Sequence, residues 1–152
     1  MENRYFPMYV DLSGQKVVIV GAGKVASRRA KVLSLFTDDI LVIALDFCKK
    51  MRLLESEQRV KLMKKSFEEE DIRRADLVIA ATNDHTLNEN IGSMCRRRKT
   101  PVNVADNPEL CDFYFPGIVT EEELVIGISS GGKSPERVKR IRQDLETYIL
   151  KK

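Results

Sequence analysis

The chain has 152 residues, 43% of them hydrophobic and 32% charged, which suits one globular domain with a small appendage and argues against disorder. A net charge of +3 does not by itself indicate a nucleic-acid partner, and without an apolar run of about 18 residues we expect no membrane span. With no apolar leader, three cysteines in no metal-ligand spacing and a single histidine, we expect a cytoplasmic protein with reduced thiols, no secretory signal and no multi-histidine metal centre.

Strands and helices are predicted to alternate through the first 105 residues. Short apolar, β-branched runs predict strands at 16–20, 40–45, 60–63, 77–81 and 102–105. Helical spacing of apolar residues predicts helices at 25–36, 49–57 and 87–99, with a short helix opened by Ser66 and Glu69 in capping-box spacing. This alternation predicts an α/β fold with a parallel sheet covered by helices on both faces.

The pattern changes after Asp106. Residues 106–130 predict a loop, a strand, a turn and a second strand. Ser134 as N-cap and Pro135 at the first helical position then predict a helix to Leu150. We therefore divide the chain into a larger domain at 1–112 and a small α+β region at 113–152.

A glycine-rich turn follows the first strand. Its sequence, GAGKVA, fits G-x-G-x-x-A between a strand and a helix. Gly21 permits the tight turn, Gly23 permits close approach of a pyrophosphate, and Ala26 permits close packing of the helix on the sheet. The turn predicts a Rossmann-like domain whose cofactor-binding residues include Gly21, Gly23, Lys24 and Val25. The alternative is a glycine turn that binds no nucleotide.

An acidic residue near the end of the second strand is expected to bond a ribose hydroxyl, and Asp46 is the candidate. An acidic side chain there favours NAD over NADP. Lys49 and Lys50 follow closely and weaken this inference. A plain loop aspartate is an equally open interpretation.

Polar residues also follow the strand at 77–81. Thr82, Asn83 and Asp84 are expected at the carboxyl edge of the sheet, beside the cofactor. The alternative is a helix cap, which Asn and Asp favour, and both roles can coexist. His85 comes next, and one surface histidine beside a cap is more often incidental than catalytic.

Asp106 follows the strand at 102–105 at the same predicted edge. In an open α/β sheet, ligands bind outside the carboxyl ends of the strands. Asp106 is therefore the best-placed ionisable group for acid–base catalysis. The alternative is a turn aspartate before Pro108.

Two further groups could bind an anion. Ser129, Ser130, Gly131 and Lys133 form a donor-rich loop before a helix, although a linker and capped helix would look the same. Arg28 and Arg29 lie early in the helix after the glycine turn. They could bind a polyanionic substrate, or Arg28 could simply lie on a solvated helix face.

Taken in order, the segments FPMYVDLSGQKVVIVGAGKVASRRAKVL, DLVIAATNDHTLN, VNVADNP, FYFPGIV and ISSGGKSP resemble the precorrin-2 dehydrogenase and sirohydrochlorin ferrochelatase family of sirohaem synthesis. The resemblance covers nearly the whole chain. Ala22 stands where the family commonly has Gly, and Arg29 stands where it commonly has Lys.

The resemblance implies that NAD⁺ accepts a hydride from precorrin-2, a polycarboxylate tetrapyrrole, and that Asp106 is the acid–base residue. In bifunctional members the same cleft then inserts Fe²⁺ into sirohydrochlorin. It also implies that region 113–152 is a dimerisation region, so that a homodimer completes a cleft that one short chain lacks. Two alternatives stay open: an NAD(H)-sensing Rossmann module without catalysis, and a dehydrogenase of a small metabolite.

Overall fold

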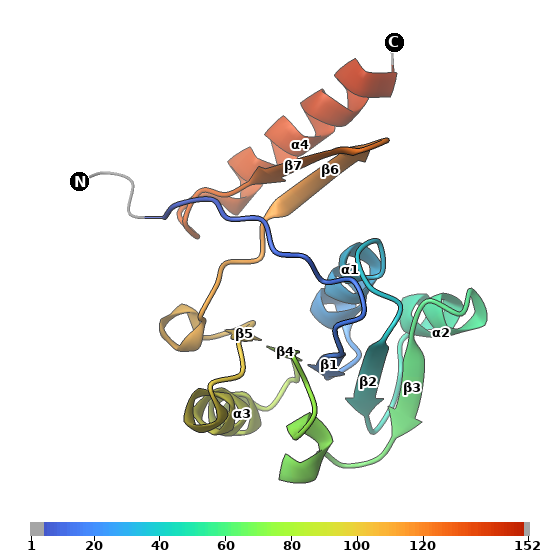
Figure 1. Cartoon of the computed structure of the whole chain (residues 1–152), viewed down its shortest axis with the longest axis vertical. Helices are drawn as coiled ribbons and strands as arrows, with labels where there is room; N and C mark the ends of the chain where they lie inside the picture. The colour runs from blue at the N-terminus through green and yellow to red at the C-terminus, as the bar shows by residue number, and fades with distance from the viewer. Residues whose placement is uncertain (1–4, 151–152) are drawn as a thin grey trace. The chain divides into compact units, whose positions relative to one another are not determined.

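A computed structural model describes residues 5–150, which form two compact units (Figure 1). One unit is Asp11–Phe113, and the other joins the described residues before Asp11 to those from Tyr114 onward. The sequence division had assigned the residues before Asp11 to the larger domain. The structure groups them with the smaller unit, where the Tyr9 hydroxyl donates a hydrogen bond to the Val125 carbonyl at 3.2 Å.

The larger unit contains a five-stranded sheet in the order β3-β2-β1-β4-β5, and every pairing is parallel. The strands are β1 Val17–Val20, β2 Ile40–Ala44, β3 Lys61–Lys64, β4 Leu77–Ala80 and β5 Val102–Val104. The chain moves outward from β1 to β3 and then crosses to the other side of β1 for β4. This reversal is the switch point of a doubly wound sheet, where such folds bind their ligands.

Helices cover both faces of this sheet, as the sequence predicted. Figure 1 shows α1 (Lys24–Leu33) and α2 (Lys49–Ser56) on one face, and α3 (His85–Arg98) with the 3₁₀ helix η1 (Glu69–Ile72) on the other. All four residues of β1 are buried, as expected for a central parallel strand covered on both sides. A second 3₁₀ helix, η2 (Pro108–Leu110), follows β5.

The predicted capping box of η1 is wrong by two residues. Glu68, not Ser66, is the N-cap, and its side chain accepts a hydrogen bond from the amide of Asp71. The Asp71 carboxylate accepts in turn from the amide of Glu68 at 2.8 Å. The Lys65 ammonium lies 2.6 Å from Glu68 and 2.9 Å from Asp71. It holds the two carboxylates together, a contact that cap spacing alone does not reveal.

The smaller unit has the predicted strand, turn, strand and helix. Its strands β6 (Gly117–Glu121) and β7 (Leu124–Ile128) pair antiparallel, and α4 (Pro135–Leu150) packs on β6. A Cβ atom on Gly117 would lie 2.9 Å from a methyl group of Val138. The missing side chain therefore lets the helix approach the hairpin closely.

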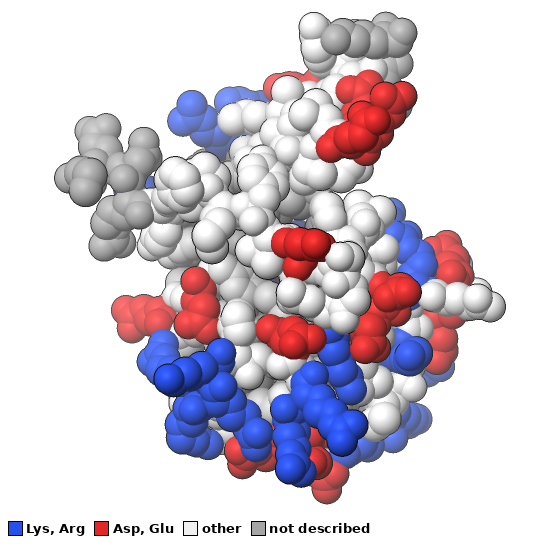
Figure 2. Space-filling view, viewed as in Figure 1, with Lys and Arg blue, Asp and Glu red and all other residues white. Residues whose placement is uncertain are grey.

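Charged side chains cover much of the larger unit. Figure 2 shows Lys and Arg gathered over α3 and η1, with acidic groups among them. Arg98 pairs with Glu69 at 3.1 Å, and Arg73 pairs with Glu70 at 2.9 Å. These pairs indicate a solvated, internally compensated face. Within residues 5–150, no helix is both long and apolar enough to cross a membrane.

We predict that the Cys95 thiol lowers the free energy of unfolding as the pH becomes alkaline. Cys95 lies on the buried face of α3, and burial raises the pKa of its thiol from an ordinary 9.0 to about 12. The unfolded chain ionises this thiol first, so its contribution is complete below pH 9.0 and is lost as the pH rises toward about 12. Urea unfolding at about pH 8 and about pH 10.5 measures the loss. A Cys95→Ala variant should lose less stability between these conditions; an equal loss would contradict the prediction.

Candidate functional site

The glycine turn is built by a close backbone approach. Gly21 has a φ of +106°, and a Cβ atom there would lie only 2.2 Å from the Ala81 carbonyl oxygen at the end of β4. Only glycine fits both the conformation and the space. The amide of Gly21 donates to the Ile43 carbonyl of β2 at 2.9 Å. The turn is thus fixed against both neighbouring strands.

Gly23 differs from Gly21, because packing does not require it. It is the N-cap of α1, its φ is −82°, and a Cβ atom there would meet nothing within 4 Å. Gly23 offers no capping side chain, and the first turn of α1 has no acidic residue. Lys24 and Val25 follow at the exposed start of the helix. Open space beside the helix N-terminus suits the pyrophosphate of a dinucleotide.

Asp46 lies two residues after β2, next to the glycine turn. The adjacent loop is tied to that turn by the Cys48 amide, which donates to the Ala22 carbonyl at 3.3 Å. The Asp46 carboxylate is largely exposed and lies 3.3 Å from an Arg52 nitrogen. The Arg52 guanidinium also lies over the Phe47 ring, 5.7 Å from its centre. Asp46 therefore lies at the same edge of the sheet as the glycine turn, and its carboxylate contacts Arg52.

The residues after β4 are used mainly to start α3. Asp84 is the N-cap, and its carboxylate accepts from the Leu87 amide at 3.0 Å, which is the capping alternative raised by the sequence. The Thr82 hydroxyl donates to the Asn88 side-chain oxygen at 2.7 Å. Asn83 is exposed between them.

Asp106 lies after β5 and is held by two residues of α3. Its Oδ2 atom contacts His85 Nδ1 in a short hydrogen bond and accepts from Asn88 Nδ2 at 3.0 Å. Asn88 is completely buried, whereas the Asp106 side chain is 24% exposed. The structure therefore presents a fixed carboxylate at the same edge of the sheet as the glycine turn.

Sequence reasoning did not identify Asn88 and treated His85 as incidental. One signal was available, because Asn88 lies on the same helical face as Ile91 and Cys95, both fully buried. A polar residue on a buried stripe needs hydrogen-bond partners, and here they are Thr82 and Asp106. The pairing of His85 with Asp106 spans 21 positions and left no signal in the local pattern.

The two arginines of α1 have different surroundings. Arg28 is exposed, but Arg29 is half-buried and donates to the Asn103 side-chain oxygen at 2.5 Å. Asn103 is itself buried and donates to the Phe113 carbonyl at 2.7 Å. Burial lowers the pKa of the Arg29 guanidinium. Arg29 therefore joins α1 to β5 and to the end of the unit, a structural contact that the sequence did not predict.

The serine and glycine loop belongs to the smaller unit. The Ser129 hydroxyl accepts from the Gly131 amide at 3.1 Å, and the Ser130 hydroxyl accepts from the Ser134 amide at 2.9 Å. These bonds shape the turn that leads into α4, with Gly131 at a φ of +62°. Lys133 is exposed.

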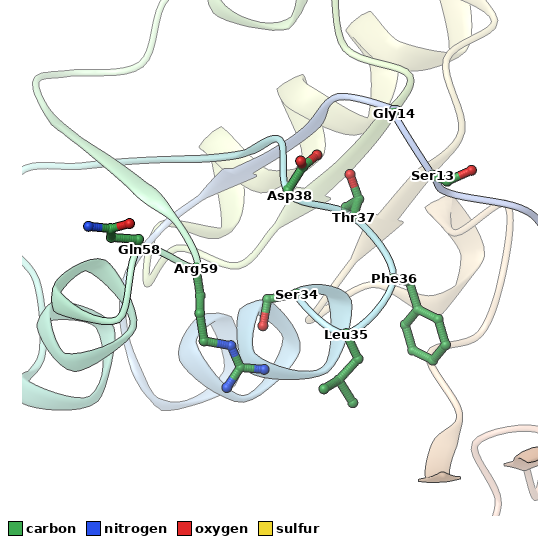
Figure 3. Close-up of a pocket in the computed structure, with 9 residues that line it drawn as sticks. All are labelled: Ser13, Gly14, Ser34, Leu35, Phe36, Thr37, Asp38, Gln58 and Arg59. Carbon is green, nitrogen blue, oxygen red and sulfur yellow. The ribbon is translucent and has the colours of Figure 1, made fainter. Parts of the chain in front are cut away.

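A hollow in the larger unit lies at the opposite edge of the sheet, at the amino ends of the strands. It holds about 420 Å³ and is formed by segments that precede β1, β2 and β3 (Figure 3). Its lining includes Ser13, Gly14, Thr37, Asp38, Gln58 and Arg59. Because nucleotides bind at the carboxyl ends of parallel strands, we do not assign it to the cofactor. Among the described residues, no group of His, Cys, Asp and Glu side chains is arranged to hold a metal ion.

The strand order, the switch point and the glycine turn define a dinucleotide-binding domain of the Rossmann class. Residues 8–117 match the family model of NAD(P)-binding domains, and the chain belongs to that family.

Three relatives are informative. The chain is 40% identical to a siroheme synthase of Psychrobacter sp. (strain PRwf-1) over 95% of its own length, which is 30% of that protein. It is 38% identical to the siroheme synthase of Pseudomonas fluorescens (strain SBW25), again over 95% of its length and 31% of the relative. The chain thus spans about a third of these curated relatives. The solved structure of SirC, precorrin-2 dehydrogenase, is 27% identical with a TM-score of 0.81, covering 96% of this chain and 74% of that one.

The two glycines of the turn provide a test with a built-in control. We expect Gly21→Ala to destabilise the fold by about 3 kcal/mol or more, through the strained φ and the collision with Ala81. Gly23→Ala should cost less than about 1 kcal/mol, yet weaken NAD⁺ binding at least about tenfold by narrowing the pyrophosphate site. Urea unfolding and a calorimetric NAD⁺ titration measure both effects. Unchanged NAD⁺ affinity in Gly23→Ala would remove the turn from the cofactor site.

Proposed function

We propose that this protein is an NAD-dependent dehydrogenase that oxidises precorrin-2 to sirohydrochlorin in sirohaem biosynthesis. The observation that carries the proposal is that the glycine turn and the anchored Asp106 lie at one edge of one sheet. The structural relative named as a precorrin-2 dehydrogenase and the matching parts of siroheme synthases supply the substrate class.

The residues at this edge fit NAD⁺ as the cofactor. The open N-terminus of α1 and the absent side chain of Gly23 would hold the pyrophosphate, and Asp46 would bond a ribose hydroxyl. Thr82, Asn83 and Asp84 follow β4 at the same edge of the sheet. When bound, NAD⁺ supplies the hydride acceptor.

The reaction requires removal of one hydride and one proton from the substrate. An acid–base group must therefore lie near the cofactor, and we propose that Asp106 belongs to it. The carboxylates of the tetrapyrrole need cationic or donor groups. Arg28 and the loop residues Ser129, Ser130, Gly131 and Lys133 are our candidates, with Arg29 adding charge from its half-buried position.

We further propose that the protein acts as a cytoplasmic homodimer whose smaller unit is the dimerisation region. Its three cysteines are free thiols, as a reducing compartment would keep them. Large apolar side chains of this unit are exposed, among them Phe6 at 88%, Met8 at 77% and Leu124 at 52%. Exposed apolar groups gathered in one small unit favour a protein–protein interface.

The function is tested by anaerobic incubation of the protein with precorrin-2 and NAD⁺. NADH and sirohydrochlorin should accumulate together, and absence of turnover by folded protein would refute the proposal. Asp106→Asn should reduce kcat by about 10²-fold or more and leave NAD⁺ affinity unchanged. Equal rates in the variant and the wild type would exclude Asp106 from catalysis.

Two further measurements test the NAD(H)-sensing alternative and the metal-insertion activity. A module that only senses NAD(H) would bind the dinucleotide but show no affinity in a sirohydrochlorin titration. Supplying sirohydrochlorin and Fe²⁺ tests the metal insertion that the family resemblance implies. The insertion is excluded if the rate with protein equals the rate without it.

The dimer is tested by light scattering. We expect a mass of twice 17.4 kDa for the wild type. Phe6→Asp should shift the protein toward the monomer, because it places a charge in the proposed apolar interface. Leu35→Asp is the matched control, since Leu35 is 55% exposed but belongs to the larger unit. A wild-type monomer, or an equal effect of both substitutions, would contradict the assignment.

A further inference from the structure

The hydrogen bond between His85 and Asp106 indicates which ring nitrogen carries the hydrogen. His85 is the first residue of α3 and the single histidine of the sequence, and its Nδ1 atom meets Oδ2 of Asp106. An ionised carboxylate can only accept a hydrogen bond, so Nδ1 carries the hydrogen. In the neutral ring the Nε2 atom is then left with its lone pair.

Asp106 is itself immobilised, so it can fix the orientation of the ring. The buried Asn88 side chain donates to Oδ2 of Asp106 at 3.0 Å and to the Thr82 carbonyl at 3.1 Å. Its oxygen accepts from the Thr82 amide at 3.1 Å and from the Thr82 hydroxyl at 2.7 Å. These bonds lock the amide between the ends of β4 and β5. A carboxylate held in this way positions an imidazole better than one on a mobile loop.

The side chains of His85 and Asp106 also differ in how exposed they are to solvent. The His85 side chain is 82% exposed, whereas that of Asp106 is 24% exposed with two donors converging on one oxygen. The His85 ring is therefore open to solvent at the edge of the sheet where we place the cofactor. A substrate approaching from solvent reaches the imidazole more readily than the carboxylate.

Resting on the dehydrogenase function above, we propose that Nε2 of His85 accepts the substrate proton and that Asp106 orients the ring and stabilises the imidazolium. One C–H bond of the substrate breaks with its electron pair leaving as hydride to NAD⁺. A proton leaves an adjacent C–H or N–H for Nε2 as the new double bond forms. The products are sirohydrochlorin, NADH and an imidazolium that releases its proton to solvent.

Two carboxylates lie close to His85, and their contacts differ. The Asp106 carboxylate contacts Nδ1 of the ring. Asp84 precedes His85, but its carboxylate is engaged with the Leu87 amide. The arrangement resembles the carboxylate–histidine pair of acyl-transfer enzymes. In those enzymes the carboxylate sets the tautomer of the imidazole, and the imidazole transfers the proton.

The tautomer can be measured without any turnover. With one histidine in the chain, nitrogen NMR of the imidazole needs no assignment, and the full-length protein can be used. We expect the neutral ring of the wild type to carry its hydrogen on Nδ1, and Asp106→Ala to restore the Nε2–H form that prevails in free imidazole. A wild-type ring protonated at Nε2 would overturn the proposal.

Kinetics test the role of the ring. His85→Gln should lower kcat by about 10²-fold with little change in KM, and added imidazole should restore part of the rate. Glu89→Gln, one turn further along α3 and also exposed, is the control and should match the wild type. Full activity of His85→Gln would overturn this inference alone. A wild type without precorrin-2 turnover would overturn the proposed function and this inference together, while the tautomer would still report whether the pair forms.

Discussion

The close approach of the Gly21 backbone to the Ala81 carbonyl is the constraint on which the site depends. β1 pairs with β2 on one side and β4 on the other, so the turn after β1 must share its space with the end of β4. A side chain at position 21 would enter the Ala81 carbonyl group, at 2.2 Å from its oxygen. With glycine at position 21, the turn packs against the ends of β2 and β4. The loops after β1, β2, β4 and β5 then meet at one edge of the sheet. The cofactor-binding character of the domain follows from this packing as much as from the open space at Gly23.

A buried amide then fixes a carboxylate at that edge. Asn88 lies in the core, where an unsatisfied polar group would be costly, and the hydrogen bonds of its side-chain amide go to residues that follow β4 and β5. The bonds that satisfy Asn88 therefore also hold Asp106 in place. Stability and pre-organisation of the site have the same physical origin here.

The charged residues divide into structural and accessible ones. Arg29 is committed to Asn103 across the sheet, and Arg98 and Arg73 pair with acids of η1. Arg28 and Lys133 are exposed on their respective units, and Asp46 is exposed but paired with Arg52. A count of basic residues would overstate the charge available to the polycarboxylate substrate that we propose, because several of these cations already have partners.

The sequence by itself determined the α/β class, the strand and helix order and the position of the glycine turn. Those features depend on residues close together in the chain: a continuous apolar run at β1, helical spacing in α1, and G-x-G-x-x-A between them. It also placed Asp106 at the correct edge, because the carboxyl ends of parallel strands meet there.

The tertiary structure alone decided which side chains became partners. His85 meets Asp106 across 21 positions, and Arg29 meets Asn103 across 74. The N-cap of η1 is Glu68 rather than Ser66, and Lys65 contacts the carboxylates of both Glu68 and Asp71. Local patterns set the backbone, since helix and strand formation are governed by near neighbours. Side-chain pairing depends on how the strand ends and helices come together in space, which no local pattern specifies.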